Sequence, residues 1–380
     1  MQKKHKIIYL INEDYYFLSH RLAIAKAALK SGYEVIVLTN VNKHGDKIIE
    51  EGFRLIPISI KRGGINPLRE LKTIIDIFKV YRIEKPDLVH QVALKQVLYG
   101  GIAAFFCKDI KIVNLVAGLG SLFISSHFKD RVIKIIVKSV LTLLLKRPGV
   151  FTIVQNPDDK AMLVDSLQIA EESLFLIRGS GVNVERFYFS EEVASPVVVA
   201  LVSRMLWDKG IAEFIDAVKQ LKAKQIEFSA VLVGDSDNEN SKTVTRTELQ
   251  KWHDDGLITW LGYQEDIAQV WRSAHIAVLP SYREGLPKAL LEAGACGRAI
   301  VTTDTPGCRE VVQDGVNGFL VPVRDANALA LALEKLINNS ELRKAMGRKS
   351  REIVTAEFSD EKVVAQTFDV YRKLLCTNAH

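Results

Sequence analysis

The sequence has few of the features that mark exported, zinc-stabilised or disulfide-bonded proteins. Its 380 residues contain four cysteines, at positions 107, 296, 308 and 376, and none of their spacings matches a CxxC pair or a zinc finger. We therefore expect four free, buried thiols, and neither a disulfide framework nor a structural zinc site.

Long apolar runs are also missing. The longest, from Val132 to Leu145, contains Lys134 and Lys138 and is shorter than a membrane-spanning helix requires. The basic start of the chain imitates a signal peptide, but the apolar run behind it stops at Ile11, before two acidic residues. We therefore expect a chain that is neither exported nor transmembrane.

The charge excess is small. The 51 Lys and Arg residues outnumber the 45 Asp and Glu residues by six, and they are spread along the chain instead of forming a stripe. This distribution disfavours nucleic acid as a partner and favours phosphate-bearing ligands or an anionic membrane surface. A hydrophobic fraction of 48% is typical of a folded protein, and the length suits two domains.

Short apolar runs that alternate with helical patterns occur in two series. The strand-like runs of the first half cover residues 7–11, 34–39, 53–59, 88–92, 112–116 and 151–155. Those of the second half cover residues 197–202, 228–233, 258–261, 276–279, 299–303 and 319–321. Helical spacing is clearest over residues 18–31, 67–83 and 132–146. This alternation is typical of parallel sheets with helices on both faces.

The pattern predicts an α/β protein of two Rossmann-like, doubly wound domains that face a cleft. A polar stretch, Asn183–Pro196, is the expected linker. We place the first domain at residues 1–186 and the second at 187–359. An amphipathic helix over 360–375 is expected to pack back on the first domain.

The segment that carries most chemistry runs from Leu279 to Val312. A polar turn with Glu284 follows a strand, a helix is expected to open near Pro287, and Glu292 lies further along that helix. Free N–H groups at a helix start bind anions such as a diphosphate, and carboxylates accept hydrogen bonds from sugar hydroxyls. Without this context, both glutamates would be read as solvated surface residues.

Two cations, Arg204 and Lys209, stand five residues apart at the first strand-to-helix turn of the second half. Such a pair can clamp a diphosphate and stabilise it as it leaves. The alternative is a pair of solvated surface cations.

Together these segments resemble family 4 of the glycosyltransferases. The likeness rests on the Glu-x7-Glu motif at 284–292, the Arg-x4-Lys-Gly motif at 204–210 and the Gly-Val-Asn run at 181–183. Residues 17–22 and 116–123 resemble, more loosely, a bacterial subgroup that acts on undecaprenyl-diphosphate-linked sugars in O-antigen, capsule and N-glycan assembly. The chain departs from many members by lacking a Gly-Gly turn after the first strand and by having Ala117 in place of a His.

The resemblance implies the GT-B fold and sugar transfer with retention of anomeric configuration, with no cofactor and no essential metal. Glu284 would hold the donor sugar while Arg204 and Lys209 neutralise the leaving diphosphate, and these three are the expected catalytic residues. The other residues expected to bind the donor are Gly234, Tyr263, Gly285, Leu286, Pro287, Lys288 and Glu292, the last of which would hold the ribose. The residues expected to bind the acceptor are Tyr16, His20, Arg21, Gly118 and Gly120.

The implied reaction transfers an N-acetylhexosamine, GalNAc or GlcNAc, from UDP onto a polyprenyl-diphosphate-linked saccharide in bacterial surface polysaccharide or glycan biosynthesis. The enzyme would be cytoplasmic and peripheral on the inner face of the cytoplasmic membrane. Other donors stay open, namely GDP-mannose, UDP-galactose or UDP-glucose with a soluble or lipopolysaccharide acceptor, as does an inactive sugar-nucleotide-binding protein. A phosphorylase or epimerase of the same architecture is disfavoured, because no motif for a pyridoxal-phosphate lysine is found.

Several features allow two interpretations. Asp235 and Asp237 imitate a DxD metal site, but they stand in a polar loop where Asp is an ordinary turn residue, and we interpret them as such. His90 is expected to be a packed residue instead of a base, and Arg21 could pair on the surface. Residues 127–147 are either a core helix with a solvated basic face or a helix that lies in the membrane interface.

Overall fold

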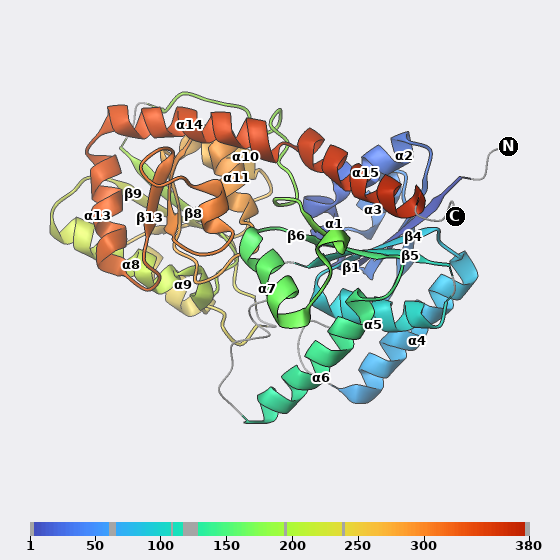
Figure 1. Cartoon of the computed structure of the whole chain (residues 1–380). Coiled ribbons are helices and arrows are strands. Elements are labelled where there is room, and N and C mark those ends of the chain that lie inside the picture. The colour runs from blue at the N-terminus through green and yellow to red at the C-terminus, as the bar shows by residue number, and fades with distance from the viewer. Residues whose placement is uncertain are drawn as a thin grey trace. The chain divides into compact units, whose positions relative to one another are not determined.

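The computed structural model describes residues 4–60, 66–107, 109–116, 128–193, 196–237 and 240–376, with side chains between 128 and 134 left out. The chain divides into two compact units (Figure 1). Unit 1 comprises Met1–Ser180 and Glu361–His380, and unit 2 comprises Gly181–Asp360. The boundary therefore lies between residues 180 and 181, six residues before the predicted one.

Unit 1 contains a parallel sheet with the strand order β3-β2-β1-β4-β5-β6-β7. The strands are β1 (Lys6–Glu13), β2 (Glu34–Asn40), β3 (Arg54–Pro57), β4 (Leu88–Val92), β5 (Lys111–Val116), β6 (Val150–Val154) and β7 (Leu174–Leu176). The helices are α1 (Asp14–His20), α2 (Leu22–Lys30), α3 (Gly45–Glu50), α4 (Pro67–Glu84), α5 (Leu94–Phe105), α6 (Phe128–Leu145), α7 (Pro157–Leu167) and α15 (Asp360–Cys376). The direction of strand addition reverses between β1 and β4.

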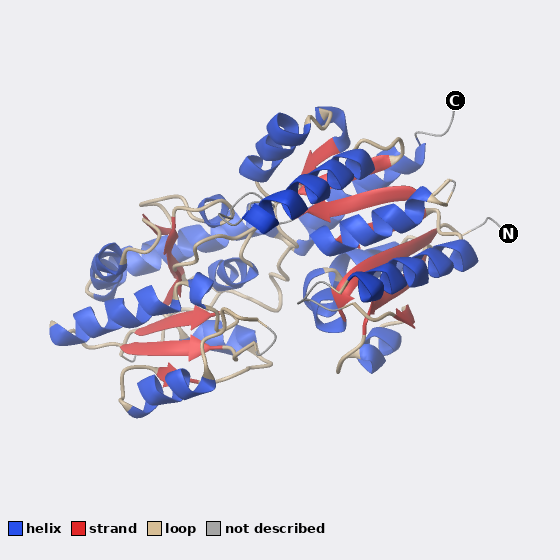
Figure 2. Ribbon diagram, turned by 90° about the horizontal axis from the view of Figure 1, so that it is seen from below, coloured by secondary structure: helices blue, strands red, loops and turns tan. Residues whose placement is uncertain are grey.

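The strands of this sheet are buried on both faces because successive side chains point to opposite sides. On one side, Ile7 and Tyr9 of β1 pack in a core with residues of α1, α2 and α15. On the other side, Ile8 and Leu10 pack in a core with residues of α4 and α5. Figure 2 shows helices on both faces of the sheet, as the near-continuous apolar runs of the strands predict.

Unit 2 repeats this plan with the strand order β10-β9-β8-β11-β12-β13, all parallel. The strands are β8 (Val198–Val202), β9 (Ser229–Val233), β10 (Thr259–Trp260), β11 (Ile276–Leu279), β12 (Ala299–Thr303) and β13 (Gly318–Val321). The helices are α8 (Ile211–Ala223), α9 (Arg246–Asp254), α10 (Ile267–Ser273), α11 (Lys288–Ala295), α12 (Cys308–Val311), α13 (Ala326–Ile337) and α14 (Ser340–Phe358), with the 3-10 turn η3 at Trp207–Lys209. Here the direction reverses between β8 and β11.

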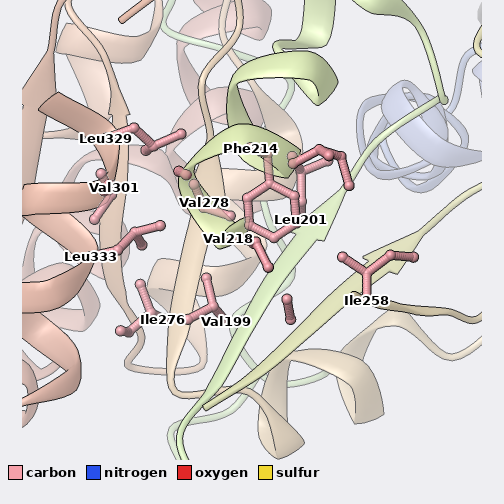
Figure 3. Close-up of a cluster of buried hydrophobic side chains, with 14 of the residues drawn as sticks. Val199, Leu201, Phe214, Val218, Ile258, Ile276, Val278, Val301, Leu329 and Leu333 are labelled. Carbon is pink, nitrogen blue, oxygen red and sulfur yellow. The ribbon is translucent and has the colours of Figure 1, made fainter. Parts of the chain in front are cut away.

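Unit 2 has a core on each face of its sheet: one against α8 and α13, and one against α10, α11 and α14. Val199 and Leu201 of β8 pack with Phe214 and Val218 of α8, and Leu333 of α13 closes the same cluster (Figure 3). Both units are therefore doubly wound α/β sheets, and the predicted fold class is confirmed at the level of each unit.

The chain crosses between the units at two adjacent points. The amide of Val182 donates to the carbonyl of Phe358 at 3.0 Å, and the amide of Asp360 donates to the carbonyl of Val182 at 3.1 Å. This short parallel bridge joins residues 182 and 359, so the first and last residues of unit 2 lie side by side. The boundary between the units therefore lies before Gly181, and α15 belongs to unit 1.

The returning helix α15 is fixed by a buried polar contact. The Tyr371 hydroxyl lies 2.5 Å from His90 Nδ1 and 3.2 Å from the Tyr9 hydroxyl. Burial, and then the charge of Arg21, hold the pKa of His90 well below its usual range. His90 is therefore a packed, neutral residue of the core, as the sequence analysis expects.

Three details differ from the expectations. The helical pattern over 18–31 is broken at Arg21 into α1 and α2. β7 is not predicted, because three residues are too few to show a pattern. Cys376 is exposed, since it lies on the last turn of α15 beyond the buried Leu374, whereas the other three free cysteines are buried. Among the helices that the structure describes, none is long and apolar enough to cross a membrane.

Because His90 is buried and neutral, we expect that acid lowers the free energy of unfolding of unit 1. An unfolded histidine has a pKa of about 6.5, and the folded pKa lies lower, so the unfolded state binds the extra proton first. Stability is fully present above about pH 7 and is lost as the pH falls below about 6.5, by up to about 1.4 kcal/mol per pH unit. Thermal unfolding of wild type and His90→Gln between pH 5 and 7.5 should show a flatter profile for the variant, with the exposed His5→Gln as control. An equal slope in His90→Gln and wild type would contradict this account.

Candidate active site

The predicted donor residues lie at one edge of the unit 2 sheet. Arg204 follows β8, Gly234 follows β9, Tyr263 follows β10 and Glu284 follows β11, so all four stand beyond the carboxyl ends of parallel strands. β8 and β11 are the neighbouring strands between which the direction of strand addition reverses. Ligands of open α/β sheets bind at such a switch point.

The turn after β8 and the turn after β11 are hydrogen-bonded to each other. The carbonyl of Asp208 accepts from the Tyr282 amide at 2.9 Å and from Ser281 Oγ at 3.1 Å. Gly210 makes this approach possible, because its φ is +73° and a Cβ there would lie 2.1 Å from the carbonyl oxygen of Pro280. The two turns therefore form one wall, although they are about 75 residues apart.

This wall carries an ion pair between two of the predicted catalytic residues. Lys209 Nζ lies 2.5 Å from Glu284 Oε1, and both side chains are half-buried. The sequence analysis places each residue in a turn after a strand, where the structure also has it, but it does not predict their contact. The carboxylate of Glu284 fixes the ammonium of Lys209 in the site, and the pair has little net charge.

Arg204 also has a carboxylate partner. Its Nη1 donates to Asp237 Oδ2 at 2.9 Å, while its side chain remains 53% exposed. Asp235, two residues before Asp237, pairs with Arg246 of α9. The two aspartates of the DxD-like sequence are thus each salt-bridged to an arginine, and the described residues contain no group of three or more His, Cys, Asp or Glu side chains suited to a metal ion.

The loops after β9 and β10 meet closely at Gly234. Its carbonyl accepts from Trp260 Nε1 at 2.9 Å, and its amide donates to the Gly262 carbonyl at 2.8 Å. A Cβ at Gly234, where φ is +134°, would lie 1.8 Å from the carbonyl oxygen of Ser203. The loop therefore runs against the residue before Arg204. Tyr263 directly follows Gly262, and its side chain is exposed.

The helix of the Glu-x7-Glu motif begins at Lys288, so Pro287 occupies the N-cap position. Gly285 and Leu286 complete the turn between Glu284 and this helix. Glu292 lies in the second turn of α11, and its burial raises the pKa of its carboxyl against the lowering effect of the Lys288 and Arg186 charges. The two motif glutamates thus differ, since Glu284 has a cationic partner at 2.5 Å, whereas burial has the largest effect on the pKa of Glu292.

The described residues expected to bind the acceptor lie in unit 1 after β1. The Tyr16 and His20 rings are stacked, with centroids 4.1 Å apart and planes 5° from parallel. Arg21 is only 1% exposed, so it does not pair on the surface, and its Nε and Nη2 have no hydrogen-bond partner within the described part of the chain. Gly118 and Gly120, together with Ala117, lie outside the described residues.

Comparisons with known proteins agree on the class of both units. Residues 185–353 match the family model of glycosyl transferases group 1, and residues 6–147 match the glycosyl transferase 4-like model. The chain is 29% identical over 373 residues to the N,N'-diacetylbacillosaminyl-diphospho-undecaprenol alpha-1,3-N-acetylgalactosaminyltransferase of Campylobacter jejuni, with 93% of this chain and 96% of the relative covered.

Solved structures show the same fold at lower identity. Sucrose-phosphate synthase from Thermosynechococcus elongatus superposes with a TM-score of 0.80 at 21% identity, covering 99% of this chain and 100% of that one. HepE of Anabaena, in complex with UDP and glucose, has a TM-score of 0.78 at 18% identity, covering 97% of this chain and 99% of that one. These neighbours are GT-B proteins, and the predicted GT-B fold is confirmed.

Proposed function

The chain belongs to the glycosyltransferases of the group 1 and 4-like families, and from this premise we propose that it transfers an N-acetylhexosamine from UDP with retention of configuration. The proposed acceptor is a polyprenyl-diphosphate-linked saccharide of a bacterial surface polysaccharide or glycan. The observation that carries the proposal is the Lys209–Glu284 ion pair beside Arg204 at the switch point of the unit 2 sheet.

The donor assignment is supported by the charges at this site. A sugar nucleotide brings a diphosphate, which requires cations, and a sugar ring, which requires hydrogen-bond acceptors. Arg204, Lys209 and Glu284 supply both kinds of group at the edge where such ligands bind. The UDP complex of HepE supports uridine as the nucleotide, and the name of the Campylobacter relative supports N-acetylgalactosamine and a diphospho-undecaprenol acceptor.

In the proposed reaction, the bond between the anomeric carbon and the diphosphate breaks while an acceptor hydroxyl bonds to the same face of that carbon. Negative charge grows on the leaving phosphate, and Arg204 and Lys209 stabilise it. The leaving phosphate oxygen takes the proton of the acceptor hydroxyl. Glu284 is a poor covalent nucleophile because Lys209 partly neutralises it at 2.5 Å, which supports its assignment to the sugar hydroxyls.

Loss of either cation should slow turnover strongly. In Arg204→Ala and Lys209→Ala the leaving diphosphate loses one electrostatic contact, for which the expected cost is about 100- to 1000-fold in kcat. Arg246→Ala is the matched control, because it removes another exposed, salt-bridged arginine of the same unit. Release of UDP is measured for each variant after circular dichroism has confirmed folding. Near wild-type kinetics in both Arg204→Ala and Lys209→Ala would refute the diphosphate clamp.

Transfer should survive an excess of EDTA. We propose that no metal ion is needed, because Lys209 and Arg204 supply the charge that a metal would otherwise bring to the diphosphate. The measurement is the rate of UDP release before and after chelation. Complete loss of activity with EDTA, restored by Mg²⁺ or Mn²⁺, would overturn this proposal.

We further propose that the enzyme is cytoplasmic and binds the inner face of the cytoplasmic membrane through unit 1. The described part of α6 has two different sides, since Leu141, Leu144 and Leu145 are buried in the unit. Other aliphatic residues of the same helix are more than half exposed: Ile135 (61%), Ile136 (57%) and Leu143 (62%). An ordinary solvated face would be polar, so these residues support the interfacial alternative over a core helix alone.

A second helix of unit 1 has the same character. Leu68, Leu71 and Ile75 of α4 are exposed and follow one another at helical spacing, with Arg69 and Lys72 between them. α5 packs against both α4 and α6 (Figure 1). It ends at the exposed Phe105 and is followed by the exposed Phe106. Apolar residues among cations suit a surface of anionic lipid headgroups.

Removal of two cations from α6, together with Lys146 directly after it, should release the protein from membranes. Each basic residue near an anionic surface contributes about 1 kcal/mol, so Lys134→Gln, Lys138→Gln and Lys146→Gln together should weaken binding by about 100-fold. Arg147 is kept, because it donates to the Ala104 and Cys107 carbonyls at the end of α5. A matched control replaces Lys344, Arg348 and Lys349 of α14 in unit 2.

The assay is co-sedimentation with anionic and neutral liposomes at low and high salt. Wild type and the α14 variant should sediment with anionic liposomes at low salt, and the α6 variant should not. If the wild-type protein stays in the supernatant under these conditions, the interfacial proposal fails and a soluble acceptor becomes the better hypothesis.

A further inference from the structure

The loop after β9, from Asp235 to Val244, is paired with the segment that follows Arg204. The Asp235 carbonyl accepts from the Met205 amide at 3.1 Å, and the Met205 carbonyl accepts from the Val244 amide at 2.8 Å. A short antiparallel bridge joins Leu206 to Thr243. The described ends of this loop are thus hydrogen-bonded to the wall of the site and extend it. An ordinary surface turn would lack these hydrogen bonds.

Asp237 is held in place by this pairing. Its amide donates to Thr243 Oγ1 at 2.8 Å, and that hydroxyl lies 3.3 Å from the Met205 carbonyl. The Asp237 side chain is only 16% exposed, and its Oδ2 accepts from Arg204 Nη1 at 2.9 Å. The carboxylate therefore presents a fixed acceptor to a cation whose own side chain is half exposed.

The contact uses only one end of the guanidinium of Arg204. Within the described residues, its Nε and Nη2 make no hydrogen bond, so the edge that they form remains open. A guanidinium binds a phosphate best through two parallel N–H groups, and it is planar, so fixing one nitrogen orients the rest. Asp237 thus restrains Arg204 and leaves it an edge that fits a phosphate.

We propose that Asp237 is a positioning residue of the donor site. It holds the plane of Arg204 so that the Nε–Nη2 edge meets the diphosphate of the sugar nucleotide. The inference rests on the proposed function of Arg204 and deepens it. Asp237 is the second aspartate of the DxD-like sequence, and its proposed role there is to bind an arginine.

In a competing interpretation, Asp237 hinders the binding of the donor. If the carboxylate only occupied Arg204 until a donor displaced it, its removal would free the cation and also remove a negative charge near the diphosphate. UDP would then bind more tightly to Asp237→Ala. The two interpretations therefore predict opposite changes in affinity.

The experiment measures UDP affinity by calorimetry and donor kinetics for wild type, Asp237→Ala, Asp237→Asn and Arg204→Ala, and for the double variant Asp237→Ala/Arg204→Ala. The matched control is Asp235→Ala, which removes a carboxylate from the same loop but one that pairs with Arg246. Thermal midpoints check that each variant is folded.

For Asp237→Ala we expect the dissociation constant of UDP and the KM of the donor to rise by about tenfold, the size of a lost charge-assisted hydrogen bond. Asp237→Asn should recover part of this loss, since an amide oxygen can still accept from Nη1. Asp235→Ala should stay within about twofold of wild type, and Asp237→Ala should add nothing in the Arg204→Ala background, because Asp237 acts through Arg204.

Unchanged or tighter UDP binding by Asp237→Ala overturns the inference, as does an equal loss with and without Arg204. If Arg204→Ala is impaired and Asp237→Ala is not, the positioning role fails and the diphosphate clamp stands. If Arg204→Ala itself binds UDP like wild type, both the clamp and the inference fail.

Discussion

The site depends on one close approach, that of the turn after β8 to the turn after β11. Hydrogen bonds from Ser281 and Tyr282 to the Asp208 carbonyl fix this approach, and Gly210 permits it because a side chain there would collide with Pro280. The Lys209–Glu284 ion pair follows directly from it. An ammonium and a carboxylate are thereby held together in the turns that follow β8 and β11, which is the arrangement that the proposed electrostatic stabilisation of a leaving diphosphate requires.

Most of the fold could be predicted because its signals are local. Parallel strands buried on both faces appear as short apolar runs, and all six predicted runs of each half become strands. The details that differ lack a local signal. β7 is too short for a pattern, the break at Arg21 interrupts an otherwise continuous helical spacing, and the boundary at Gly181 depends on a bridge between residues 182 and 359.

The sequence predicts at which edge of the sheet the candidate residues lie, but not which of them contact each other. Motif spacing places Arg204, Lys209 and Glu284 at strand ends, and the topology brings those ends together. The spacing of motifs does not show which loops contact each other. It therefore does not predict the pairing of Arg204 with Asp237, and from the sequence Asp237 resembles an ordinary turn residue. The burial of Arg21 likewise has no local signal in the sequence, since it depends on how α1 and α2 pack against β1 and α15.

The proposed reaction is the retaining transfer of an N-acetylhexosamine from UDP to a polyprenyl-diphosphate-linked saccharide. The most direct test incubates the enzyme with UDP-GalNAc or UDP-GlcNAc and a synthetic polyprenyl-diphosphate disaccharide, and follows the anomeric proton of the product by NMR. We expect release of UDP and a new α-linked sugar, which keeps the configuration of the donor. A β-linked product, or transfer from GDP-mannose with none from either UDP sugar, would contradict it.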